Sequence, residues 1–135
     1  MTPRDPSLET DGPAAAKISA YLGEPFTPWQ TAAADVGLER LPDGRPRYPI
    51  VVVTVPRQAG KTTLLRAVAV HKMLKSPNRR VFYTAQTGKD ARERWSDLVT
   101  KLERNPETAP RFKTYLGAGS PRLIHPASGS RYSPF

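Results

Sequence analysis

The residues of this sequence best suited to chemistry are Gly60, Lys61 and Thr62, which end the segment PRQAGKTT. A glycine lets the backbone approach a phosphate group, a lysine can reach the β- and γ-phosphates of a nucleotide, and a threonine hydroxyl can bind Mg²⁺. The general pattern G-x-x-x-x-G-K-[ST] also has an earlier glycine, and Val55 takes that position here. The segment therefore predicts a phosphate loop that lacks the first glycine of the general pattern. The alternative is a chance triplet in a turn.

Two elements would position these residues. The run IVVVTV from Ile50 to Val55 is apolar and β-branched, which predicts a strand buried on both faces. After the loop, LLRAVAVHKML predicts a helix that ends at Ser76 and Pro77. A strand, a loop and a helix in this order bring backbone N–H groups and the positive end of the helix to one anion site. The apolar spacing predicts that one helix face packs on the sheet: Leu64, Leu65, Val68, Ala69 and Met73.

The predicted nucleotide contacts extend along the phosphate loop, residues 55–63. They are Arg57, Gln58, Ala59, Gly60, Lys61, Thr62 and Thr63. Lys61 and Arg57 are the predicted catalytic residues, because their charges can stabilise the charge of the transition state. Thr62 is the predicted ligand of the Mg²⁺ that accompanies the nucleotide. The expected cofactors are therefore ATP and Mg²⁺.

A second candidate site lies upstream, in residues 25–36. Thr27 and Pro28 form a helix-start signal, which places Trp29 and Gln30 in the first turn. A glutamine amide can donate to and accept from the edge of adenine, and an indole offers an apolar face. The pair is a candidate adenine clamp. The alternative is that Trp29 anchors the core while Gln30 faces solvent.

Three segments together resemble the ATPase domain of the large terminase subunit of tailed bacteriophages, the motor that drives DNA into the prohead. They are V-P-R-Q-x-G-K-T at the loop, P-W-Q at Pro28 to Gln30, and Y-T-A-Q-T at Tyr83 to Thr87. Terminases often lack the first glycine and carry an arginine where Arg57 stands, so the departure from the general pattern favours this family. In the family, a glutamine-containing segment before the loop contacts adenine, which is the role implied for Gln30.

The resemblance implies an α/β fold, a P-loop NTPase-type parallel sheet flanked by helices. It implies ATP hydrolysis coupled to movement of double-stranded DNA without sequence preference. The implied protein partners are the portal protein and the small terminase subunit, in the cytoplasm of the bacterial host. Two other interpretations stay open: a fragment of another DNA-dependent P-loop ATPase such as a helicase, and a non-catalytic basic module with a vestigial loop.

One part that such an ATPase needs is missing from the sequence. Hydrolysis requires an apolar strand that ends in Asp, to hold Mg²⁺ and activate water, and no acid after Thr62 ends an apolar run. In terminases that strand follows a segment resembling GSRYSP, and a nuclease domain comes later. We therefore expect a disordered leader at residues 1–12 and a partial ATPase domain at 13–135. The chain would then be either a truncated gene product or one piece of a split gene whose remainder is on a separate chain, and this chain alone would be inactive.

Composition sets further limits. The sequence has no cysteine, so disulfides and thiolate metal sites are excluded, and His71 and His125 are its only imidazoles. It has no apolar run of about 18 residues and no signal-peptide pattern, which predicts a cytoplasmic protein of one domain. Residues 1–55 hold 5 basic and 7 acidic side chains, a net charge of −2, whereas residues 56–135 hold 16 and 5, a net charge of +11. The second part could bind a polyanion or present a solvated surface.

The remaining patterns predict the other elements. A helix is expected from Pro13, a hairpin around Pro42 to Gly44, and a strand over residues 79–85 that a right-handed crossover joins to residues 50–55. A short strand is expected at Arg122 to His125. The clearest helix starts at a capping box of Thr87 and Asp90. Its apolar residues share one face: Ala91, Trp95, Leu98, Val99 and Leu102.

Overall fold

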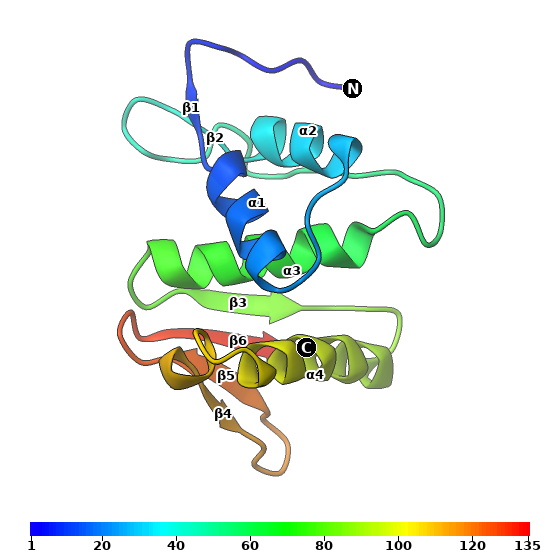
Figure 1. The fold of residues 1–135 in the computed structure, drawn as a ribbon, viewed down its shortest axis with the longest axis vertical. Helices are drawn as coiled ribbons and strands as arrows, with labels where there is room; N and C mark the ends of the chain where they lie inside the picture. The colour runs from blue at the N-terminus through cyan, green and yellow to red at the C-terminus, as the bar shows by residue number, and fades with distance from the viewer. The chain divides into compact units, whose positions relative to one another are not determined.

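The computed structural model describes all residues, 1–135, and the chain divides into two compact units, Met1–Val68 and Ala69–Phe135 (Figure 1). The first unit contains β1 (Glu9–Thr10), α1 (Gly12–Tyr21), α2 (Pro28–Gly37) and β2 (Glu39–Arg40). Helix α3 (Lys61–Lys75) begins in the first unit and ends in the second. The second unit contains β3 (Arg80–Tyr83), α4 (Gly88–Arg104), the 3₁₀ turn η1 (Ala109–Arg111), β4 (Lys113–Tyr115), β5 (Arg122–His125) and β6 (Ser130–Pro134). None of the helices combines the length and the apolar character needed to cross a membrane.

Helices α1 and α2 form the core of the first unit. Gly12 packs directly on α2, because a Cβ at that position would overlap Asp35. The Thr10 hydroxyl donates to the Asp35 carbonyl at 2.7 Å, and Ala15 and Ala34 are buried. Small side chains therefore allow the two helices to approach closely.

The N-terminal residues differ from the expected disordered leader. Strand β1 pairs antiparallel with β2, with Thr10 opposite Glu39. The fully buried Glu39 carboxylate accepts hydrogen bonds from Arg4 at 2.9 Å, from the Asp5 N–H at 2.8 Å and from Arg47 at 2.6 Å. A buried carboxylate needs such partners, and residues 4–10 are ordered because they supply them.

The strand expected at residues 50–55 is not formed. Ile50 and Val52 are 79% and 82% exposed, and no backbone of this run belongs to either sheet. Strand propensity alone forms no strand, because the backbone groups need a second strand as partner. The crossover from this run to β3 is therefore also wrong. The turn expected at Pro42 to Gly44 is present, with the Leu41 N–H donating to the Arg45 carbonyl at 2.8 Å.

The second unit is a four-stranded sheet in the order β3-β6-β5-β4. Only β3 and β6 are parallel, so the sheet is mixed and not wholly parallel as expected. Helix α4 covers one face, where the Trp95 indole N–H donates to the Tyr132 carbonyl at 2.9 Å (Figure 1). The protein is thus α/β, and the buried side chains between this sheet and helix include Trp95, Leu98, Leu102 and Leu123.

The helices agree with the sequence better than the strands do. Helix α4 has the expected cap, since the Asp90 N–H donates to the Thr87 hydroxyl at 3.1 Å, and its apolar residues are all buried. Helix α3 ends at Lys75, just before Ser76 and Pro77 as expected. Its buried face is shifted, because Leu65 is 49% exposed. Its buried residues are Leu64, Ala67, Ala69, Val70, His71 and Met73, so Ala69 and Met73 of the expected face are buried together with Leu64.

Candidate nucleotide-binding loop

The predicted phosphate loop forms a tight turn immediately before α3. Gln58 and Gly60 both have positive φ, 60° and 100°, and helix α3 begins at Lys61. Two left-handed residues within three positions curl the backbone sharply. The free N–H groups of the first turn of α3 then follow the curled segment, which is the arrangement that binds an anion.

Gly60 is required by its surroundings as well as by its φ. A Cβ at this position would lie 2.5 Å from Nε2 of Gln30, closer than side-chain atoms pack. The ring of Trp29 lies behind it, with Cζ2 3.9 Å from the same point. A larger residue at position 60 would therefore displace the loop or the start of α2.

Trp29 and Gln30 hold the loop in place. The Trp29 indole N–H donates to the Ala59 carbonyl at 3.0 Å, and the Gln30 amide donates to the Gly60 carbonyl at 2.8 Å. The Gln30 oxygen accepts from the N–H of Thr27 at 2.7 Å, closing half of the capping box of α2. Gln30 is only 3% exposed, so the alternative of a solvent-exposed Gln30 is wrong. An adenine contact by this pair stays a prediction, because its polar atoms face the loop here.

Lys61 lies at the first position of α3 with an exposed side chain. Its Nζ donates to the Val55 carbonyl at 3.3 Å, a long hydrogen bond that closes the loop onto itself. Thr62 is half-buried next to it, and Arg57 is exposed at the tip of the turn without an ion pair. Arg57 thus lies in the loop, and Lys61 and Thr62 lie in the first turn of the helix that follows it.

Glu24 is a neighbour of the loop that the sequence did not indicate. Its carboxylate accepts from the Thr63 hydroxyl at 3.4 Å and from Arg66 at 3.4 Å, both on the first turns of α3. It comes from the connection between α1 and α2, where no spacing or neighbouring pattern marks it. Glu24 therefore helps to position the start of α3 through these two contacts.

No group of three or more His, Cys, Asp and Glu side chains that could hold a metal ion by themselves is present. His71 and His125 are both buried. His125 Nδ1 lies 2.8 Å from the Ser128 hydroxyl, whose own proton goes to the Met73 carbonyl, so the ring nitrogen is the donor. A metal at the loop would need a nucleotide to supply further ligands.

No protein-family model matches the sequence, and no curated protein matches it. A solved structure does: the HK97 bacteriophage large terminase superimposes with a TM-score of 0.70 over 92% of this chain, at 18% sequence identity. The aligned part is 27% of that protein, so the chain spans about a quarter of its length. The likeness confirms the fold that the three sequence segments implied.

Proposed function

We propose that the chain is the ATP-binding part of a phage terminase large subunit, the motor that moves viral DNA into the prohead. The observation that carries the proposal is the backbone conformation and close packing of Gly60. Its backbone is left-handed, the Gln30 amide fills the space of a side chain, and a 15-residue helix starts at the next residue. The fold that the chain shares with the HK97 large terminase supports the same conclusion.

The residues of the loop fit the phosphates of a nucleotide. The N–H groups at the start of α3 and the positive end of its dipole face an anion bound over Gly60. Lys61 can leave the Val55 carbonyl, because that hydrogen bond is long and exposed, and can donate to the β- and γ-phosphates. The hydroxyl of Thr62 would hold Mg²⁺, which neutralises phosphate charge when bound, and Arg57 would stabilise the transition state in cis.

The proposal also assigns partners. These are double-stranded DNA, the portal protein and the small terminase subunit, in the cytoplasm of the host. The carboxylate of Glu24, next to the first turns of α3, is engaged by the Thr63 hydroxyl and by Arg66. We therefore expect nucleotide binding without turnover.

Titration with ATP and with ADP by calorimetry tests the proposal. Lys61→Ala should remove most of the binding, whereas Lys89→Ala, an exposed lysine at the start of α4, should leave it unchanged. Phosphate release should stay at the level of a buffer control. Equal affinity in the wild type and Lys61→Ala would defeat the proposal of a nucleotide site. Release that disappears in Lys61→Ala would contradict the absence of turnover.

A further inference from the structure

The sheet of the second unit has two faces of opposite character. On the face under α4, Leu123 and Tyr132 are opposite each other and buried. Side chains alternate along a strand, so the residues between these point to the other face. There Arg131 lies between Arg80 of β3 and Ile124 of β5. Lys113 of β4 is opposite Ile124 and ends the same row.

The next row on this face combines aromatic rings with a fourth cation. Tyr115 is opposite Arg122, whose guanidinium lies 5.0 Å from the ring centroid. At the other edge Phe82 is 60% exposed and touches the ring of Phe135 edge-on, with centroids 6.1 Å apart. The basic sheet face is therefore defined by one cation from each strand, Arg80, Lys113, Arg122 and Arg131, and by Phe82 and Tyr115 at its edges.

No carboxylate balances these four cations. None of them forms an ion pair, whereas Arg4 and Arg47 of the first unit pair with Glu39. A groove of about 380 Å³ runs along the face and contains no acidic residue. It is lined by residues that include Arg80, Phe82, Arg122, Arg131 and Phe135. The face therefore carries a cluster of positive charge with aromatic side chains at its edges.

We propose that the basic sheet face binds the phosphate backbone of duplex DNA, an inference that rests on the proposed function and names the surface through which DNA is held. Neighbouring strands are about 4.8 Å apart, so cations on four strands span roughly 14 Å. One DNA strand presents a phosphate about every 3.4 Å of rise along the helix axis, so consecutive phosphates of a strand lie within reach of a face of this width. A protein partner would have to bury four cations and supply a carboxylate to each, which is costly. Phosphates match the charge without that requirement.

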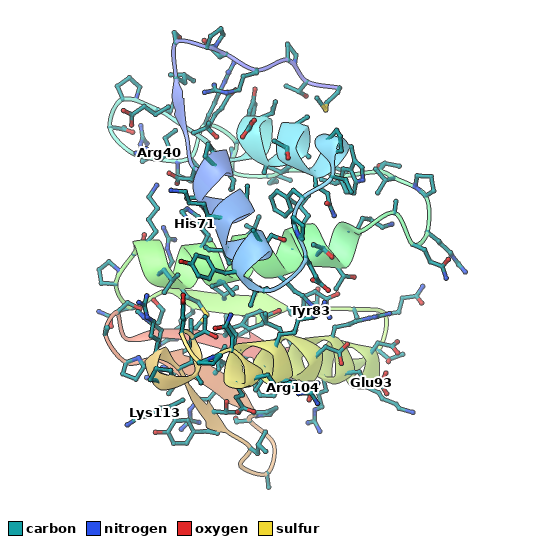
Figure 2. All side chains as sticks on the ribbon, viewed as in Figure 1. Arg40, His71, Tyr83, Glu93, Arg104 and Lys113 are labelled. Atoms are coloured by element: carbon teal, nitrogen blue, oxygen red, sulfur yellow. The ribbon has the colours of Figure 1, made fainter.

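Fluorescence anisotropy with a labelled duplex of random sequence tests the assignment on the whole chain. Arg80→Gln/Arg131→Gln should lower the affinity at least about tenfold and reduce the slope of log K against log salt by about 2, since each lost phosphate contact contributes about 0.9. The matched control is Arg92→Gln/Arg104→Gln, which removes the same charge from exposed positions of α4. Figure 2 labels Arg104 on this helix. The control should change the affinity about twofold or less and leave the slope unchanged.

A second face variant, Lys113→Gln/Arg122→Gln, guards against a local folding defect, and circular dichroism reports whether each variant is folded. Equal losses in face and control variants, or a wild type that does not bind the duplex, would overturn the assignment. If only a partner protein bound the face, DNA affinity would be the same in all variants, which also overturns it. Nucleotide titration of the same variants separates the two proposals, because the face can fail while Lys61-dependent binding stays intact.

Discussion

Residues 50–55 and strand β6 differ both in amino-acid composition and in whether their backbones pair with other strands. The first is six consecutive β-branched residues, yet most of them are exposed and the run belongs to neither sheet. The second, SRYSP, contains two serines and a proline, yet it lies inside the sheet with β3 on one side and β5 on the other. Its Tyr132 is buried and its backbone binds Trp95. A strand therefore needs partners more than it needs propensity.

The serines of β6 and of the turn before it contribute to that pairing. Ser130 Oγ donates to the Ser76 carbonyl at 2.9 Å and accepts from the Arg79 N–H at 3.1 Å. Ser128 Oγ donates to the Met73 carbonyl at 2.8 Å. These bonds satisfy carbonyls at the end of α3 and the amide that enters β3. Polar residues that look like a loop in the sequence thereby fasten the centre of the second unit.

The largest expected effect sets the paired sheet against the unpaired run. Trp95→Ala should lower the free energy of unfolding by about 3–5 kcal/mol, because it leaves a cavity under α4 and removes the indole hydrogen bond to the Tyr132 carbonyl. Val52→Ala should change it by less than about 0.5 kcal/mol, since that side chain is exposed. Urea unfolding followed by circular dichroism measures both. A large loss in Val52→Ala would show that residues 50–55 are packed.

An intermediate effect is expected at Glu39, whose buried carboxylate accepts hydrogen bonds from Arg4, Asp5 and Arg47 in the first unit. Burial acts to raise the pKa of this carboxyl, but hydrogen bonds from the Asp5 N–H, Arg47 and Arg4 together lower it below its usual value of 4.5. Glu39→Gln should cost about 2 kcal/mol, because charged hydrogen bonds are lost while both arginines can still reach water.

The lowered pKa of Glu39 also predicts how the stability of the protein changes with pH. A lowered folded pKa means that its contribution is present above about 4.5 and is lost as the pH falls through the folded pKa, so the wild type should lose this stability in acid while Glu39→Gln does not. Thermal unfolding between pH 3 and pH 7 checks this. Glu9→Gln, an exposed partner of Arg40, is the control and should be almost neutral. Parallel curves for wild type and Glu39→Gln would refute the prediction.

The smallest expected effect concerns His125 at the end of β5. Burial and the nearby charge of Arg111 lower the pKa of its imidazole below 6.5. The unfolded chain therefore takes up the proton first, and stability should fall as the pH drops below about 6.5. His125→Gln should flatten that fall in the melting temperature between pH 7.5 and 5.5. An unchanged slope in the variant would mean that the imidazole is not the titrating group.

Local signals in the sequence determined several parts of this protein. The cap at Thr87 and the spacing of apolar residues fix α4, because a helix satisfies its hydrogen bonds within one segment. The turn at Pro42 to Gly44 and the start of α3 after Gly60 follow from residues a few positions apart. The resemblance of three segments to terminases also implied the fold that the HK97 likeness supports.

Only the tertiary structure decided what distant residues do together. Gln30 holds the Gly60 carbonyl across 30 positions of sequence, and Glu24 reaches Arg66 across 42. Strand β6 finds both its neighbours through long connections, whereas residues 50–55 find none. Buried polar groups and strand backbones must be satisfied by whichever partner the fold brings near, and that partner leaves no periodic trace in the local sequence.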